Sequence, residues 1–131
     1  MANHLIVTSE TALALSEQLK TEEILKPLQK EILLFETYIA GTMYIEDESL
    51  IDALNIGEKL TLKREPQNAF DEKAIRVDNK DGKKLGYVPE KDNLIFSRLM
   101  DAGKMLYAKV VKVREKIGYT QVDIEIYLMD F

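Results

Sequence analysis

The residues best suited to chemistry lie between positions 64 and 77. Phe70 and Asp71 are adjacent there, Asn68 precedes them, and basic residues stand on both sides. An aromatic ring stacks on an unpaired nucleobase, and a carboxylate accepts hydrogen bonds from hydroxyl groups or amines. Because a carboxylate repels phosphate, Asp71 beside a nucleic acid is suited to a hydroxyl group, such as the free 3′ hydroxyl of a strand.

Further aromatic and basic residues extend this set. The candidates for binding a nucleic acid are Tyr44, Lys63, Arg64, Asn68, Phe70, Asp71, Lys73, Tyr87 and Lys91. Small barrels hold single strands on faces of this composition. Each aromatic residue alone is also typical of a part-buried core residue. Asn68 and Asp71 are also typical of a side-chain-capped turn after Pro66.

Groups for catalysis are few in this sequence. The chain has one histidine, His4, and no cysteine, so it cannot assemble a serine–histidine pair or a thiolate metal site. Adjacent acids such as Asp71 and Glu72 face opposite sides when they lie on a strand. We therefore predict a protein that is not an enzyme and needs no cofactor or metal. A metal-dependent accessory of a nuclease or phosphoesterase, using Asp71 and neighbouring acids, stays open as an alternative.

The composition predicts one folded domain with a short appendage. The chain has 131 residues, 46% of them hydrophobic, and no linker rich in glycine, proline or serine divides it. No apolar run reaches the length of a membrane span, and the first residues do not resemble a signal peptide. The absence of cysteine fits a reducing compartment. We expect a cytoplasmic protein without a membrane partner.

The charge is distributed unevenly along the chain. A net charge of −5 argues against a general nucleic-acid coat, which must neutralise many phosphates. Residues 37–58 carry five acidic residues and no lysine or arginine, whereas residues 59–91 carry nine basic and six acidic residues. The local excess of positive charge therefore coincides with the candidate binding residues, although an ordinary mixed surface has the same pattern.

Residues 1–34 are predicted to form an N-terminal helical extension. Leucine and isoleucine recur there at helical spacings, and Thr21 with the acids after it resembles a helix start. Pro27 requires either a first turn or a kink. Two interpretations stay open: a lid over an apolar patch of the next domain, or a helical hairpin that binds a partner or dimerises. The sequence does not determine the oligomeric state.

Beyond residue 34 the apolar pattern changes to a period of two. It predicts strands at 33–41, 59–64, 74–77, 83–88, 105–114 and 121–129, with turns at 78–82 and 115–118. One helix is predicted at 90–102, ending at Gly103. Six short strands in fewer than 100 residues indicate a small barrel, because closure removes exposed strand edges.

Several motifs in this order resemble the HIRAN domain over roughly residues 36–129. They are Gly41 with Tyr44, Gly57 with Lys59-Leu60-Thr61-Leu62, Arg64-Glu65-Pro66-x-Asn68-x-Phe70-Asp71-x-x-Ala74-Ile75-x-Val77, and Leu85-Gly86-Tyr87-Val88-Pro89. The resemblance implies a modified small barrel of the OB or SH3 type with a helix inserted between strands. We accordingly predict a mainly β (α+β) fold, with residues 35–131 forming a six-stranded barrel domain.

The resemblance also implies a function. HIRAN domains occur in Swi/Snf-type DNA translocases that remodel stalled replication forks, and as small free-standing bacterial proteins. They capture the 3′ end of single-stranded DNA. By position, Tyr44 and Phe70 match the stacking aromatics, Asp71 matches the acceptor of the terminal hydroxyl, and Asn68 matches a loop residue that orients it.

The chain departs from the DNA-binding members at two places. Met43 stands where those members have a basic residue, and Pro89 and Glu90 precede Lys91 where they have basic residues. Both departures imply fewer phosphate contacts. The sequence thus predicts a non-enzymatic module that binds single-stranded DNA 3′ ends and recruits a repair, replication or helicase enzyme. The alternative from another class is a protein-interaction adaptor that uses residues 1–34.

Overall fold

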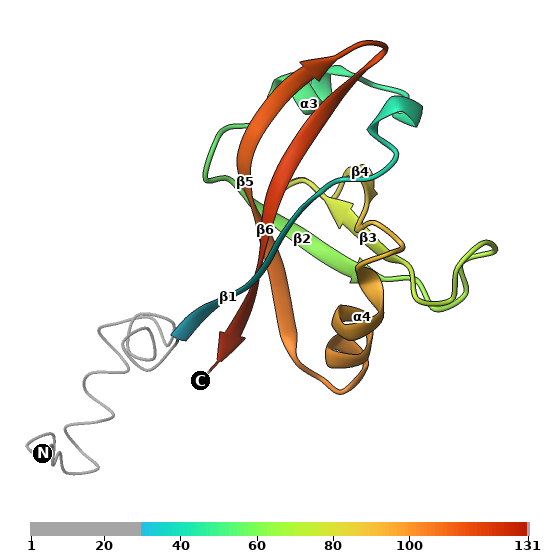
Figure 1. Cartoon of the computed structure of the whole chain (residues 1–131), viewed down its shortest axis with the longest axis vertical. Coiled ribbons are helices and arrows are strands. Elements are labelled where there is room, and N and C mark those ends of the chain that lie inside the picture. The colour runs from blue at the N-terminus through green and yellow to red at the C-terminus, as the bar shows by residue number, and fades with distance from the viewer. Residues whose placement is uncertain (1–29, 131) are drawn as a thin grey trace, which may run out of the picture. The chain divides into compact units, whose positions relative to one another are not determined.

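The computed structural model describes residues 30–130 (Figure 1). The elements of this part of the chain are six strands, two short helices and one 3-10 turn. They are β1 (Lys30–Tyr38), the 3-10 turn η3 (Thr42–Tyr44), α3 (Ser49–Asp52), β2 (Lys59–Arg64), β3 (Ile75–Asp78), β4 (Lys84–Tyr87), α4 (Asn93–Asp101), β5 (Met105–Lys116) and β6 (Tyr119–Asp130). None of the helices in this part of the chain has the length and apolar character of a membrane span.

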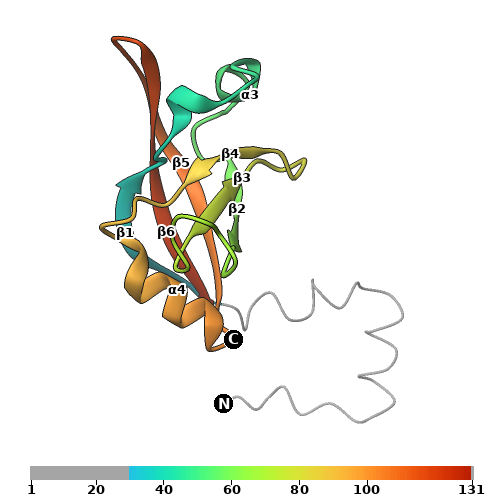
Figure 2. The ribbon, with the colours of Figure 1, turned by 90° about the vertical axis from the view of Figure 1, so that its right-hand side faces the viewer.

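The six strands form one curled sheet in the order β1-β6-β5-β2-β3-β4 (Figures 1 and 2). The chain after β1 brings the two ends of this sheet together. The Ile39 amide donates to the Val122 carbonyl at 2.9 Å, and Ala40 exchanges hydrogen bonds of 2.7 and 3.0 Å with Tyr87. The sheet therefore closes on itself through this short bridge, and the predicted six-stranded small barrel is confirmed.

Gly86 makes this closure possible. A Cβ atom at position 86 would lie 2.3 Å from the Ala40 carbonyl oxygen and 2.6 Å from the Cγ2 atom of Ile39. Both distances are far inside van der Waals contact, so a larger residue would separate the two chain segments. The glycine of the Leu85-Gly86-Tyr87 motif thus allows a close backbone approach.

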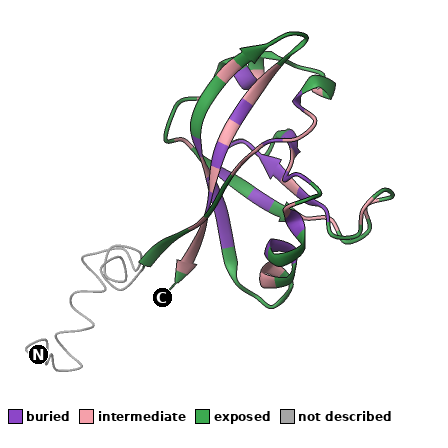
Figure 3. Cartoon of the chain, in the orientation of Figure 1, coloured by how far each residue is buried: buried purple, intermediate pink, exposed green. Residues whose placement is uncertain are grey.

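The core fills the inside of the curled sheet. Exposed and buried residues alternate along β2, where Leu60 and Leu62 are buried and their neighbours are not. Phe96 of α4 joins the same core. Figure 3 shows the buried residues along the strands and on one side of α4. The other members of this core are Ile39, Ile51, Ile75, Val77, Leu85, Val88, Leu106, Ala108, Val110, Val122, Ile124 and Ile126.

The predicted elements agree with the structure within a few residues, except near the N-terminal boundary. Strand β2 has the predicted bounds, and α4 starts three residues later than predicted. Strand β1 covers Lys30–Tyr38, so the predicted helical extension is wrong for residues 30–32, and the strand predicted from residue 33 starts three residues earlier. The rest of the predicted helical extension lies outside the described residues. The segments η3 and α3 were not predicted.

Candidate nucleic-acid interface

The loop between β2 and β3 is held by the side chain of Asn68. Its Oδ1 atom accepts hydrogen bonds from the amides of Phe70 at 2.9 Å and Asp71 at 3.1 Å. Its Nδ2 atom donates to Oε1 of Glu65 at 3.1 Å. An asparagine that accepts from amides two and three residues ahead fixes a turn. Asn68 therefore sets the direction in which Phe70 and Asp71 leave the loop.

Arg64 stabilises the end of the same loop that leads into β3. Its guanidinium donates to the carbonyls of Ala74 at 2.7 Å and Glu72 at 3.0 Å, and it makes hydrogen bonds of 2.8 and 3.2 Å to the carboxylate of Asp101. The hydrogen bond from Arg64 lowers the pKa of Asp101. Arg64 was predicted as a DNA contact, but these four bonds direct its guanidinium into the protein.

Asp71 is held from two sides. Its Oδ1 atom accepts from the Lys73 amide at 2.9 Å, and its Oδ2 atom accepts from Nδ2 of Asn93 at 2.8 Å. Asn93 is the first residue of α4 and only 2% exposed, so its amide has a fixed position. The Asn93 hydrogen bond, followed by that of the Lys73 amide, lowers the pKa of Asp71. The carboxylate is therefore ionised at neutral pH, and each oxygen keeps a lone pair for a ligand.

A pocket of about 400 Å³ adjoins this carboxylate. Its size lies within the usual range for small-molecule sites. Phe70 lies at its border and is 97% exposed, so its ring is accessible to a ligand. Figure 3 shows that most of the loop carrying Phe70 and Asp71 is exposed. The polar and aromatic side chains that line the pocket come from the β2–β3 loop, from β4 and from the start of α4 with the residues before it. They are Asn68, Phe70, Asp71, Lys84, Tyr87, Glu90 and Asn93.

Tyr87 forms a fixed wall of this pocket. Its hydroxyl donates to Oε1 of Glu65 at 2.7 Å, and the Nζ atom of Lys84 lies 4.6 Å from the centre of its ring. The Tyr87 hydrogen bond lowers the pKa of Glu65. Glu65 thus connects Tyr87 to Asn68 and ties the wall of the pocket to the loop.

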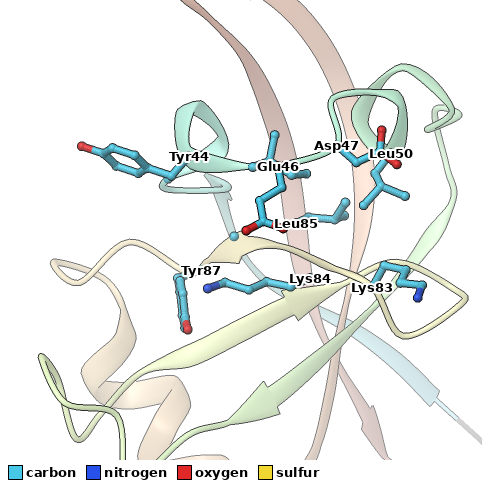
Figure 4. Close-up of a pocket in the computed structure, with 11 residues that line it drawn as sticks. Tyr44, Glu46, Asp47, Leu50, Lys83, Lys84, Leu85 and Tyr87 are labelled. Carbon is cyan, nitrogen blue, oxygen red and sulfur yellow. The ribbon is translucent and has the colours of Figure 1, made fainter.

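Tyr44 lies beside a second hollow of about 470 Å³, which is formed by β4 and the segment from Gly41 to Leu50 (Figure 4). Gly41 begins the turn that carries it with φ of 83°, a conformation that favours glycine. The hydroxyl of Thr42 donates to the Thr120 carbonyl at 2.7 Å and fixes this turn to β6. The Tyr44 side chain is 82% exposed. Tyr87 and Lys84 line both this hollow and the pocket beside Asp71.

The side chains of the remaining predicted residues do not line the pocket beside Asp71. Lys63 is exposed on β2 and borders a shallow hollow beside Pro66. Lys73 is exposed in the loop, and its amide binds Asp71. Lys91 borders a different hollow with β1, β5 and β6, and its Nζ atom lies 5.7 Å from the ring of Tyr38. Of the predicted basic residues, none lines the pocket beside Asp71.

Two residues of the site, Asn93 and Lys84, were not predicted from the sequence. Asn93 belongs to a predicted helix that carried no functional assignment, and its contact with Asp71 spans 22 positions. Lys84 stands in a predicted strand, where lysine is typical of a solvated face. The only signal for Lys84 was its place three residues before Tyr87. Within residues 30–130, no three histidine, cysteine, aspartate or glutamate side chains are placed to hold a metal ion.

The chain forms a small β-barrel with a pocket beside its β2–β3 loop. The model of the HIRAN domain family matches residues 32–129, and the chain therefore belongs to this family. No curated protein matched the chain in a sequence comparison.

Solved structures have the same fold. A protein from Lactobacillus plantarum is 25% identical with a TM-score of 0.73, over 79% of this chain and 99% of that protein. The crystal structure of the HIRAN domain of human HLTF is 19% identical with a TM-score of 0.61, over 76% of this chain and 78% of the other. An NMR structure of that human domain in its DNA-bound conformation is 19% identical with a TM-score of 0.56, over 76% and 79% of the two chains.

Proposed function

We propose that this HIRAN domain is a non-enzymatic module that binds the 3′ end of single-stranded DNA. The observation that carries the proposal is the geometry of Asp71. Its carboxylate is fixed by the buried Asn93 beside a pocket, and the exposed ring of Phe70 borders that pocket. The DNA-bound conformation named for the human HLTF domain supports DNA as the ligand class.

In this proposal Asp71 accepts a hydrogen bond from the terminal 3′ hydroxyl. The hydroxyl is a donor, and the low pKa of Asp71 keeps the acceptor charged at neutral pH. A terminal phosphate in the same place would meet the negative charge of Asp71 and be repelled. The acid therefore selects a free strand end against an internal phosphate.

Phe70 supplies the stacking surface for the terminal base. Its ring is almost fully exposed, and base stacking on such a ring contributes about 1 to 3 kcal/mol. Tyr87 and Asn68 do not contact the base through free polar groups, because their side chains are bound to Glu65 and to the loop. They act as positioning residues that hold the pocket open.

Few cations surround the site, so electrostatic attraction contributes little. Arg64 is bound internally, and Lys84 is the one lysine of the described chain that lines the pocket beside Asp71. We expect about two phosphate contacts on a single strand, which corresponds to a slope near −1.4 in log affinity against log salt. Recruitment of a repair or replication enzyme would then add the affinity that the domain lacks.

A competition experiment tests the proposal. A fluorescent oligonucleotide with a free 3′ hydroxyl is bound to the full chain, and unlabelled linear or circular single strands of the same sequence are added. The linear strand should displace the probe, and the circular strand, which has no end, should not. Phe70→Ala should weaken the linear complex about tenfold, whereas Ile56→Ala, which removes another exposed apolar side chain, should not. Equal competition by the circular strand would refute end recognition.

A further inference from the structure

We infer that the hollow between β4 and the segment from Gly41 to Leu50 is a second nucleotide subsite with a preference for guanine. It would hold the base next to the 3′-terminal one. The inference rests on the proposed function, because the terminal nucleotide must first occupy the pocket beside Asp71. The hollow has a volume of about 470 Å³, enough for one nucleobase and its sugar.

The two sites are adjacent along β4. Lys84 and Tyr87 line both of them, so these two side chains form the boundary between the hollow and the pocket. Two neighbouring nucleotides placed in the two sites must carry their linking phosphate across this boundary. The ammonium group of Lys84, 4.6 Å from the Tyr87 ring centre, is the cation at that place.

The hollow has the surfaces that a base requires. Tyr44 offers an aromatic ring that is 82% exposed, and Ile45, Leu50 and Leu85 contribute apolar lining. Figure 4 shows the ring of Tyr44 at one side of the hollow and Tyr87 across from it. Stacking on an aromatic ring tolerates any base, so selection among bases requires a polar group in addition.

Glu46 is the polar group placed to select the base. Figure 4 shows its side chain extending from the segment after Tyr44 toward Leu85 and Lys84. The other acid of the hollow, Asp47, already uses its Oδ1 atom to accept from the hydroxyl of Ser49 at 2.5 Å and from the Ser49 amide at 3.0 Å. Within residues 30–130 neither oxygen of Glu46 accepts a hydrogen bond, so Glu46 is the carboxylate of the hollow with both oxygens available to a ligand.

A carboxylate at this position favours guanine. On its pairing edge guanine presents two neighbouring donors, the N1 hydrogen and the N2 amino group, which match the two oxygens of a carboxylate. Adenine and cytosine place an acceptor beside their single amino group, and thymine places its one donor between two carbonyls. These acceptors would face the negative charge of Glu46.

The test uses single strands with a free 3′ hydroxyl that differ in one amino group. The base next to the terminal one is guanine or hypoxanthine, which lacks the N2 amino group, and all other bases are thymine. Fluorescence anisotropy with the full chain should show about fivefold weaker binding for hypoxanthine, the scale of one charge-assisted hydrogen bond. Glu46→Ala should remove the difference, and Glu115→Ala, at an exposed acid of the β5–β6 hairpin, should retain it.

The proposed phosphate contact of Lys84 is tested separately, by the salt dependence of binding. Lys84→Gln should reduce the salt slope by about 0.7, the amount expected for one phosphate on a single strand. Lys104→Gln, at an exposed lysine after α4, should leave the slope unchanged.

The two proposals fail in different ways. If hypoxanthine and guanine strands bind equally while the linear strand still excludes the circular one, the guanine subsite is wrong and end binding stands. If linear and circular strands compete equally, the end-binding proposal fails and the subsite fails with it. A difference between guanine and hypoxanthine that persists in Glu46→Ala would also overturn the assignment of Glu46.

Discussion

Replacing Asn93 by aspartate would test how the site holds its acid. In the wild type the Nδ2 atom of Asn93 donates to Oδ2 of Asp71 over 2.8 Å, and Asn93 is buried. Asn93→Asp has nearly the same shape but places a second carboxylate against the first. Two like charges about 4 Å apart repel by about 4 kcal/mol at an effective dielectric constant of 20. Such a repulsion raises the apparent pKa of the pair by roughly 3.

The sign of the pH dependence follows from these pKa directions. In the wild type the pKa of Asp71 is lowered, so its contribution to stability is present at neutral pH and is lost only as the pH falls through that low value. In Asn93→Asp the pKa of the pair is raised. Its stabilising contribution is then present at low pH, where the two acids share a proton, and is lost as the pH rises through the raised value.

Urea unfolding and DNA anisotropy at about pH 5 and about pH 8 measure both effects. The wild type should bind 3′ hydroxyl ends with about equal affinity at the two pH values, because Asp71 carries the same charge at both. Asn93→Asp should be less stable and bind more weakly at pH 8 than at pH 5. Gln67→Glu adds one charge at an exposed position of the same loop and should behave as the wild type. A variant Asn93→Asp with wild-type pH profiles would refute the role of Asn93.

Three further substitutions test the barrel and its electrostatics. Gly86→Ala should lower the free energy of unfolding by about 3 kcal/mol in urea unfolding, because its Cβ would collide with the carbonyl of Ala40. Its control is Gly82→Ala, where the space is open, and this variant should lower the free energy of unfolding by about 1 kcal/mol. Arg64→Gln should lower stability by about 1 to 2 kcal/mol and leave the salt slope of binding unchanged; a shallower slope would mean that Arg64 binds phosphate after all. Met43→Arg should increase DNA affinity about fivefold in anisotropy, and no gain would place the phosphate path elsewhere.

Strand β2 was predictable because it has one buried face. Leu60 and Leu62 alternate with exposed residues, and this pattern alone gives the bounds of β2. The same reasoning failed at Ile32, which was assigned to a helix, because the continuous apolar run of Ile32 and Leu33 fits a helix as well as a strand. Both residues lie in β1 and are partly exposed, at 39% and 48%. An edge strand with exposed apolar residues has no distinct pattern in sequence.

The site was predictable where its residues are neighbours in sequence. Phe70 and Asp71 form one local unit, and their place in an exposed loop followed from Pro66 and Asn68. Contacts between distant residues could not be predicted in this way. Arg64 has the charge of a phosphate ligand, but its carboxylate partner Asp101 lies 37 positions away. A long-range partner changes the role of a side chain without changing any nearby residue.

The most direct test of end recognition compares two strands that differ only at their last atoms. One single strand ends in a 3′ hydroxyl and the other in a 3′ phosphate, and both are titrated against the full chain by fluorescence anisotropy. If Asp71 accepts the terminal hydroxyl, the hydroxyl strand should bind at least about tenfold more tightly, and Asp71→Asn should reduce that preference while Asp52→Asn should not. Equal affinity of the wild-type chain for the two strands would contradict the account.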